Sequence, residues 1–301
     1  MPVSHVVIVF RSRHRAQCRQ RALALHAMGI DHAVRPLAGE WTLLVPEEQA
    51  ADAISQLEQF VRENRDWPRK KITLPYHRVG PRGVAAYVLV LLLVAAAKGS
   101  EAFELDWFDS GRMHAGMVCD GEWWRTVTSL TLHLNAEHLL SNLLFGTAFV
   151  LIIGHLLGNG LALFSMLVAG AVGNGLNALV QPPHHTAVGA STAVFAALGL
   201  TAAYVWLRRR DLQQRWAIRW APVVGGVALL AFTGSGGERT DIVAHLTGFL
   251  AGLGMGAYYA GLGPGIVLGP RGQRLLGLGA VVLLVVAWAI ALAVHGSDVP
   301  F

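Results

Sequence analysis

Four polar residues, His138, Asn142, Ser191 and His245, lie in otherwise apolar stretches of the sequence. Polar side chains are costly inside a membrane, so each of them needs an explanation. Serine and histidine are the minimum pair for nucleophilic acyl transfer, because the imidazole accepts the hydroxyl proton and returns it to the leaving group. The apolar stretches offer no Asp or Glu as a third member. The sequence therefore predicts a two-residue dyad of Ser191 and His245.

His138 and Asn142 supply a second element of the same chemistry. They are one helical turn apart and face the same way. Together with the backbone N–H of Ser191 they can donate hydrogen bonds to a developing oxyanion. Gly189, two residues before the serine, leaves room for a backbone or a substrate to come close. Taken singly, a Ser in a Gly/Ala-rich helix is usually a packing residue, so the prediction depends on the combination.

Other chemistries that could operate inside a membrane fit the sequence less well. The run His133-Leu-Asn-Ala-Glu-His138 has neither the HExxH spacing of a metalloprotease nor its inverted form. An aspartyl protease needs two carboxylates in the membrane, whereas Asp241 stands alone at an edge. His184 and His185 follow two prolines in a short loop, where we expect both to be exposed. We therefore expect no metal and no cofactor.

The composition indicates the kind of protein that holds these residues. Of 301 residues, 53% are hydrophobic and 14% are charged, compared with about a quarter charged in a soluble domain. From His138 to Leu207 the sequence has no Lys, Arg, Asp or Glu. A stretch of this length allows three membrane passes of about 20 residues each. The composition excludes a single soluble globule and a disordered chain, and it predicts an integral membrane protein.

The charge is concentrated near the N-terminus. Residues 1–82 hold 13 Lys/Arg and 8 Asp/Glu, whereas residues 83–301 hold 11 of each kind. Because the basic residues adjoin a hydrophobic span, they indicate membrane orientation rather than nucleic-acid binding. Cys18 and Cys119 form neither a disulfide framework nor a metal-type spacing. The apolar run near the start is too short for a signal peptide, so we expect the N-terminus to stay in the cytosol.

Seven hydrophobic spans are predicted in the second part of the chain. They cover about residues 83–97, 138–157, 161–181, 186–207, 221–235, 242–262 and 275–294. Basic clusters before the first span, between the fourth and fifth, and before the seventh all fall on the cytosolic side with this count. The second, fourth and sixth spans then run from outside to inside. His138, Asn142, Ser191 and His245 consequently lie at one shallow depth below the outer surface.

The N-terminal residues 1–67 predict a small α/β domain. Strand patterns at 6–10, 32–36 and 41–46 alternate with helical patterns at 15–28 and 47–64, in the order βαββα of a ferredoxin-like fold. Residues 68–82, with three prolines and a basic run, predict a linker on the membrane surface. Residues 83–301 form the predicted membrane domain, in which segment 98–137 lies outside.

Four motifs in this order resemble those of the rhomboid family of intramembrane serine proteases. They are Trp124-Arg125, the HxxxxHxxxN pattern of His133, His138 and Asn142, the nucleophile motif Gly189-Ala-Ser191, and the AHxxGxxxG motif containing His245, Gly248 and Gly252. The resemblance covers residues from about 83 to 262. It implies an all-α polytopic bundle with a six-helix core. The seventh span resembles the extra C-terminal helix of some members, and residues 1–67 resemble the cytosolic domain of some bacterial members.

The resemblance also implies roles for individual residues. It makes Ser191 the nucleophile, His245 the base, and His138, Asn142 and the Ser191 amide the oxyanion hole. Gly248, Gly252 and Gly256 would let the sixth helix pack tightly on the fourth, in agreement with small-residue packing in membranes. Trp124 and Arg125 would anchor the outer loop, within which His133 would form a hydrogen bond.

Two residues depart from the family pattern. Thr192 replaces the Gly that follows the serine and could crowd the approach to the active site. Phe195 stands where many members have a Tyr that stacks on the histidine, so the stacking is kept and the hydroxyl is lost. Neither change removes a reacting group, and we therefore expect activity with an altered substrate preference.

These observations predict an intramembrane serine endopeptidase that cleaves transmembrane or juxtamembrane segments of membrane proteins. We expect it in the bacterial plasma membrane, with the N-terminus in the cytosol and both the active site and the C-terminus toward the outside. Residues 1–67 could bind a cytosolic partner. Two alternatives remain. One is a rhomboid-like protein that binds clients without cutting them, whose relatives typically lack the Ser or the His. The other is a transporter, which would need a polar path across the whole bilayer.

Overall fold

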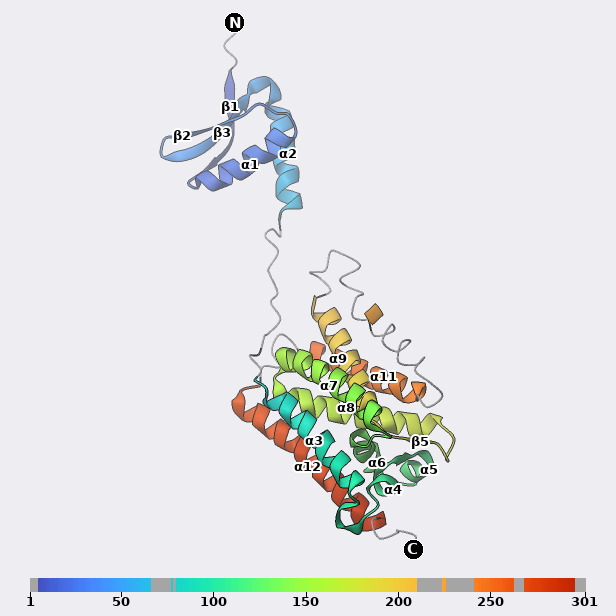
Figure 1. Ribbon diagram of the computed structural model, residues 1–301. Helices are drawn as coiled ribbons and strands as arrows, with labels where there is room; N and C mark the ends of the chain where they lie inside the picture. The colour runs from blue at the N-terminus through green and yellow to red at the C-terminus, as the bar shows by residue number, and fades with distance from the viewer. Residues whose placement is uncertain are drawn as a thin grey trace. The chain divides into compact units, whose positions relative to one another are not determined.

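The computed structural model describes residues 5–65, 77, 80–209, 224–225, 241–262 and 268–295. The chain divides into two compact units, residues 1–71 and 72–301. Figure 1 shows a small α/β unit and a larger helical unit, which are described separately below.

The N-terminal unit has the predicted βαββα order. Its elements are β1 (Val6–Ser12), α1 (Arg15–Ala27), β2 (Ala33–Leu37), β3 (Glu40–Pro46) and α2 (Ala50–Glu63), with a 3-10 turn at Glu47–Gln49. The strands form one sheet in the order β1-β3-β2, and β3 is antiparallel to both neighbours. This is the split arrangement of the first five elements of a ferredoxin-like fold. The side chains of Leu25, Leu43 and Ala53 are fully buried between the sheet and the helices.

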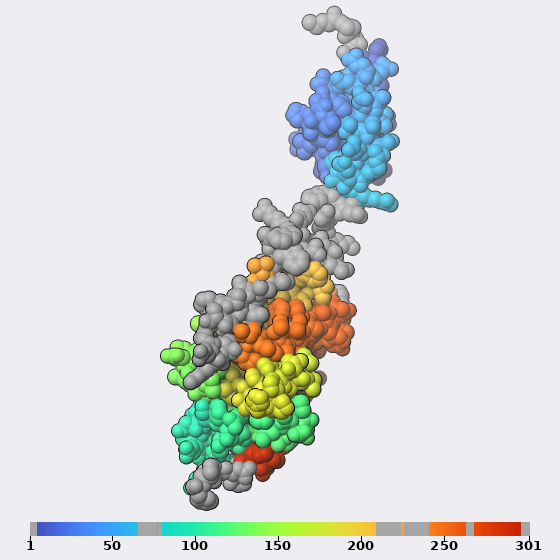
Figure 2. All heavy atoms as spheres, turned by 90° about the vertical axis from the view of Figure 1, so that its right-hand side faces the viewer, coloured from blue at the N-terminus to red at the C-terminus, as the bar shows by residue number. Residues whose placement is uncertain are grey.

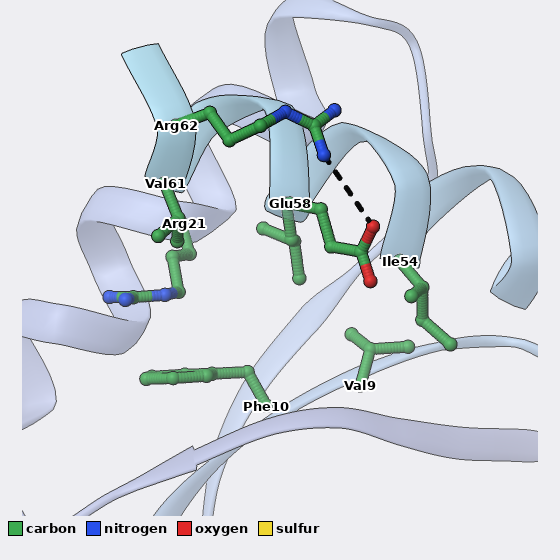
Figure 3. Close-up of a pocket in the computed structure, with 8 residues that line it drawn as sticks. Val9, Phe10, Arg21, Ile54, Glu58, Val61 and Arg62 are labelled. Carbon is green, nitrogen blue, oxygen red and sulfur yellow. Dashed lines mark ion pairs between the residues drawn. The ribbon is translucent and has the colours of Figure 1, made fainter. Parts of the chain in front are cut away.

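Helix α2 is amphipathic, but its apolar stripe is only partly covered. Leu57 is buried in the core, whereas Ile54 and Val61 are each 48% exposed. These residues line a groove of about 380 Å³ with Val9 and Phe10 of β1 (Figure 3). The guanidinium of Arg21 lies over the Phe10 ring, 3.9 Å from its centroid. The groove therefore has an apolar floor and a partly charged rim.

The helical unit contains six helices, within the described residues, that are long and apolar enough to span a membrane. They are α3 (Arg82–Gly99), α7 (Ala136–Leu157), α8 (Asn159–Val180), α9 (Ser191–Arg209), α11 (Ile242–Gly261) and α12 (Pro270–His295). The protein is thus a multi-pass membrane protein. The predicted span 221–235 lies outside the described residues except for residues 224–225, which are helical.

The fourth span begins later than predicted. We expected it to start at residue 186, but α9 begins at Ser191. Thr186–Ala187 instead forms a short strand, β5, which pairs with β4 (Met113–His114). After β5 the chain bends at Gly189 and turns at Ala190, and Ser191 is the first residue of the helix.

Helices α9 and α11 pack with their backbones in close contact. A Cβ atom added at Gly248, Gly252 or Gly256 of α11 would overlap the main-chain carbonyl oxygen of Thr192, Ala196 or Leu200 of α9, respectively. The matched positions advance by four residues on both helices. The two helices therefore run in the same direction, with Ser191 and His245 at the same end.

Residues 100–135, between α3 and α7, form a compact segment that we call the α3–α7 segment. It contains 3-10 turns at Ala102–Glu104 and Ser129–Thr131, the strand β4, and the short helices α4 (Trp107–Gly111), α5 (Ala115–Cys119) and α6 (Arg125–Thr128). Helix α12 packs on this segment. The Trp288 ring lies against Trp107, with 4.9 Å between centroids, and its Nε1 donates a hydrogen bond to Thr131 Oγ1.

The opposite end of α12 contacts the turn between α7 and α8. Gln273 Nε2 donates a hydrogen bond to the Leu157 carbonyl at 2.6 Å, and its Oε1 accepts one from Leu161 N–H at 3.0 Å. These bonds satisfy one of the last carbonyls of α7 and one of the first N–H groups of α8, which have no partner within their own helices. Helix α12 is thus joined to the bundle at both ends.

Candidate active site

Ser191 lies at the N-terminus of α9 and is partly exposed. The first N–H groups of a helix have no partner in the helix itself, and the helix dipole places partial positive charge there. The Ser191 amide is therefore well suited to donate a hydrogen bond to an anionic oxygen. Two residues earlier the main chain is held in place, because Gly189 N–H donates a hydrogen bond to the Ser129 carbonyl at 2.9 Å.

His245 lies in the first turn of α11 and is 7% exposed. Its ring stacks on that of Phe195, with 4.4 Å between centroids and an interplanar angle of 22°. Phe195 is one helical turn after Ser191, so this stacking places the imidazole beside the start of α9. Among the described residues, His245 Nδ1 is buried and has no hydrogen-bond partner. In this part of the chain the aromatic stack, rather than a carboxylate on Nδ1, orients the ring.

His138 approaches the serine from the first turn of α7. Its ring edge lies so close to Gly189 that an added Cβ there would be 2.7 Å from His138 Nε2, and 3.5 Å from Ser191 Oγ. Gly189 also has φ +130°, a conformation that L side chains rarely adopt. Both the space and the backbone thus require glycine at position 189. His138 and Ser191 consequently face the same small volume.

Asn142 is 4% exposed and lies one turn after His138. Its Nδ2 donates one hydrogen bond to the His138 carbonyl at 2.9 Å, which leaves its second amide proton for another acceptor. The Asn142 carbonyl accepts a hydrogen bond from the Tyr87 hydroxyl of α3 at 2.8 Å. The Tyr87 ring occupies the gap left by Gly146, where any Cβ would overlap it. The sequence offered no sign of this role for Tyr87, because its partner is a main-chain atom far away in the chain.

The supporting residues predicted in the α3–α7 segment lie close together. The Arg125 side chain is buried, with 2% exposed. Its Nη1 donates hydrogen bonds to the main-chain carbonyls of Asp109 at 2.8 Å and Arg112 at 2.9 Å. Its Nε forms an ion pair with Glu122. Trp124 packs against the buried cluster that contains Leu132 and Trp288. Burial alone would raise the pKa of Glu122, but the hydrogen bonds and positive charge of Arg125 and His295 hold it below its usual value.

The His133 ring interacts with the Thr131 backbone of the same segment. The ring also packs edge-on against His138, at 5.1 Å between centroids. The carbonyl of His133 accepts a hydrogen bond from Lys98 Nζ of α3. Burial, with smaller contributions from His138 and Lys98, outweighs the hydrogen bond with the Thr131 backbone and lowers the pKa of His133 to about 3. This residue therefore stays neutral and acts through packing.

Thr192 does not crowd the approach to the serine, contrary to our expectation. It is 3% exposed, and its methyl group lies between Gly173 of α8 and Gly248 of α11. Successive helical residues point about 100° apart, so the side chain after Ser191 faces the helix interface rather than the site. Thr192 is thus a packing residue.

One prediction about the rim of the site is wrong in part, and it concerns the exposure of His185. Asp241 caps α11 and accepts a hydrogen bond from His185 Nε2 at 2.7 Å. His185 is accordingly only partly exposed, whereas His184 is exposed as expected. An Asp directly before an apolar helical run is a recognisable N-cap signal, but its contact with His185 could not be found from the sequence. Within the described residues, no three His, Cys, Asp or Glu side chains form a group that could hold a metal ion.

The fold and the site together define a multi-pass membrane protein with a serine and a histidine brought to one end of two parallel helices. Residues 120–262 match the sequence model of the Rhomboid domain. Over this match, which covers just under half of the chain, the protein is similar to the rhomboid proteases.

Several known members are similar in sequence. Rhomboid-like protease 3 of Toxoplasma gondii is 31% identical over 58% of this chain and 66% of its own length. The putative rhomboid protease YdcA of Bacillus subtilis is 29% identical over 45% of this chain and 66% of its own length. Rhomboid protease GluP of Bacillus subtilis is 29% identical over 72% of this chain and 40% of its own length. The chain thus spans slightly under two thirds of the first two relatives and less than half of the third.

Proposed function

We propose that this protein is an intramembrane serine endopeptidase that cleaves transmembrane or juxtamembrane segments of other membrane proteins through a Ser191–His245 dyad. One observation carries the proposal: Phe195, one turn after Ser191, stacks on His245, while Gly248 seats α11 against Thr192. These contacts hold Ser191 and His245 at the same end of adjoining helices, which supports their proposed roles as nucleophile and base. The similar proteins are named a rhomboid-like protease, a putative rhomboid protease and a rhomboid protease, which supports the same reaction.

The arrangement suits a two-step acyl transfer. Ser191 Oγ attacks the scissile carbonyl carbon, and its proton passes to His245. His245 then gives this proton to the leaving amine nitrogen as the C–N bond breaks, which leaves an acyl-enzyme. A water molecule attacks the ester, transfers a proton to His245 and releases the acid, and His245 returns the proton to Ser191. No metal or cofactor takes part in this scheme.

The negative oxygen formed in each step needs hydrogen-bond donors. The Ser191 amide, the His138 ring and the second Asn142 amide proton supply them in the proposed mechanism. The Tyr87 hydrogen bond to the Asn142 carbonyl and the fit of His138 against Gly189 hold two of these donors in place. The mechanism thus depends on α3 and α7 as well as on the helices of the dyad.

We also propose the orientation of the protein and its membrane. The basic residues of the first quarter of the chain place the N-terminus in the cytosol by the positive-inside rule. The ends of α7, α9 and α11 that carry the site, and the C-terminus, then face outward. The proposed location is a bacterial plasma membrane. Attaching an impermeant thiol probe to Cys119, in α5, tests the orientation, since only an outward-facing cysteine is labelled in intact cells.

A cytosolic partner of residues 1–67 is a further proposal, supported by the groove between β1 and α2 (Figure 3). The change Val61→Asp places a charge on its exposed apolar rim. We expect this variant to cleave a model substrate normally when purified and more slowly in cells. Equal rates in cells for Val61→Asp and wild type would exclude a partner at this groove. The control is Leu23→Asp, on an exposed apolar residue of α1 outside the groove.

Cleavage of a single-span model substrate by the purified protein in liposomes tests the main proposal. The wild-type protein should cleave, and Ser191→Ala and His245→Ala should each reduce the rate by a factor of at least about 10³. A fluorophosphonate probe should label Ser191 in the wild type and not in Ser191→Ala. Cleavage that survives both substitutions would refute the dyad. A lack of both cleavage and labelling would favour the alternative that the protein binds clients without cutting them.

A further inference from the structure

Asp241 joins three parts of the helical unit through one carboxylate. Its Oδ1 accepts a hydrogen bond from the Ala244 amide at 2.9 Å, in the first turn of α11. Its Oδ2 accepts hydrogen bonds from Asn177 Nδ2 of α8 at 2.9 Å and from His185 Nε2 at 2.7 Å. A carboxylate that accepts several hydrogen bonds is held firmly, because hydrogen bonds to a charged group are shorter and stronger than those between neutral groups.

His185 connects this carboxylate to the chain that leads to the serine. It belongs to residues 181–190, which we call the β5 segment. The His185 carbonyl accepts a hydrogen bond from Ala115 N–H, and the Pro183 carbonyl accepts one from Gly116 N–H. In the space-filling view the β5 segment (yellow) lies between the α3–α7 segment (green) and α11 (orange) (Figure 2).

The β5 segment ends at the nucleophile, and α11 begins with the base. Ser191 directly follows Ala190, while His245 lies one helical turn after Asp241. The hydrogen bond between His185 and Asp241 therefore spans the two chain segments that carry the dyad. Within the described residues, this side-chain hydrogen bond joins the β5 segment directly to the N-cap of α11.

The position of Asp241 also has an electrostatic consequence. His245 becomes positively charged when it accepts the serine proton, and residues four apart on a helix lie on the same side. A carboxylate one turn away, in a poorly hydrated site, stabilises that positive charge. Among the described residues, His245 Nδ1 has no hydrogen-bond partner. The Asp241 carboxylate therefore acts on the imidazole through its electrostatic field and not through a direct hydrogen bond.

We propose that Asp241 is a positioning residue of the dyad: through His185 and α11 it fixes Ser191 relative to His245, and its charge stabilises the protonated His245. This inference rests on the proposed function. Neither residue touches the reacting atoms, so both act through Ser191 and His245. A plain N-cap would stabilise α11 without affecting the chemical step, and the experiment below separates these two roles.

The variants remove the charge and the bonds separately. Asp241→Asn keeps a good N-cap. Both side-chain bonds can also be kept in Asp241→Asn. Asn177 can turn its amide and accept with its Oδ1, which has no partner among the described residues, and His185 can change its tautomer and accept with Nε2. Asp241→Ala removes the cap, both bonds and the charge. His185→Ala removes one bond, and His185→Gln retains a donor. His184→Ala, on the exposed neighbouring histidine, is the matched control.

Three quantities are measured for each purified variant in liposomes: kcat and KM for the model substrate, the rate of fluorophosphonate labelling at Ser191, and the melting temperature. Asp241→Asn should lower kcat and the labelling rate about tenfold with KM and melting temperature nearly unchanged. Asp241→Ala should lower kcat about a hundredfold and also reduce the melting temperature. His185→Ala should lower kcat about fivefold, with recovery in His185→Gln and no effect in His184→Ala.

The outcomes distinguish this proposal from the proposed function. Wild-type kcat and labelling in Asp241→Asn and His185→Ala, with Ser191→Ala inactive, would overturn the positioning role and leave the protease intact. A lower melting temperature in Asp241→Ala with unchanged kcat would reduce Asp241 to an N-cap, which also overturns it. If the wild type neither cleaves nor labels at Ser191, the dyad itself fails, and the positioning role fails with it.

Discussion

Phe195 stacks on His245 with 4.4 Å between the ring centroids and an interplanar angle of 22°. Both rings are more than nine-tenths buried, and they come from different helices. Since His245 Nδ1 has no partner among the described residues, this stacking is the main described restraint on the orientation of the imidazole. The predictions below begin with this pair.

Removing the Phe195 ring should impair catalysis more than replacing it. We expect Phe195→Ala to lower kcat by about 10² because His245 loses its near-attack orientation, and to destabilise the fold by about 3–5 kcal/mol. Phe195→Tyr should retain kcat within about threefold, because the stacking face is kept. Initial rates and thermal melting of the two variants check this. Equal kcat in Phe195→Ala and wild type would show that the stacking does not orient the base.

The contact between α9 and α11 should not tolerate a methyl group at its glycines. We expect Gly252→Ala to reduce the free energy of unfolding by about 2 kcal/mol or more, because the new Cβ overlaps the Ala196 carbonyl and forces the helices apart. Gly254→Ala is the matched control on the same helix, where a Cβ meets open space. It should be neutral or slightly stabilising, by up to about 1 kcal/mol. Unfolding in a denaturing detergent measures both, and equal losses would contradict the packing described.

The carboxylate of Glu122 should stabilise the protein only above acid pH. Its pKa is lowered in the folded state, because the bonds and charges of Arg125 and His295 outweigh the effect of burial. The stabilisation is complete above the ordinary pKa of a glutamate, about 4.3, and is lost as the pH falls through the lower folded value. Glu122→Gln should therefore melt at a lower temperature than wild type at pH 7, and the difference should shrink at pH 3. A difference independent of pH would refute this.

The buried His133 should make the protein less stable in mild acid. Its pKa is about 3 when folded, compared with about 6.5 for an ordinary histidine, so below pH 6.5 the unfolded chain binds a proton that the folded chain does not. Stability therefore falls as the pH drops from about 6.5 toward 3. His133→Phe should reduce the drop in melting temperature between pH 7 and pH 5. An unchanged drop would show that His133 is not the group responsible.

Loss of the Trp288 indole should loosen the α3–α7 segment. Trp288 is 7% exposed, contacts Trp107 and donates a hydrogen bond to Thr131. We expect Trp288→Ala to lower the melting temperature and to increase amide hydrogen exchange in residues 107–131, with about 3–5 kcal/mol lost. Val285→Ala, on an exposed residue of the same helix, is the control. Unchanged exchange in Trp288→Ala would mean that α12 does not brace this segment.

Much of the architecture could be predicted because membranes impose strong sequence patterns. The apolar spans and the βαββα order follow from hydrophobic periodicity, and α7, α8, α11 and α12 lie close to their predicted bounds. The start of α9 was misplaced, because Thr186–Ala187 is apolar enough to continue a span but pairs with β4 instead. Pairing with a distant strand leaves no local signal in the sequence.

The polar residues of the site could be singled out because each is costly in an apolar span. Their partners could not. Tyr87, Glu122 and His185 bind atoms far away in the chain, and periodicity carries no information on such contacts. Thr192 shows the opposite error, since a residue beside the nucleophile in sequence points away from it on a helix.

The contacts of α12 also bear on the order in which the protein is completed. Trp288 and His295, which hold Thr131 and Glu122, lie at the end of the last described helix. During synthesis, residues 100–135 leave the ribosome more than 150 residues before these two partners exist. The α3–α7 segment can therefore acquire its final set of contacts only after α12 has entered the membrane. Until then the newly made chain holds the serine and the histidine without the full support of the surrounding structure.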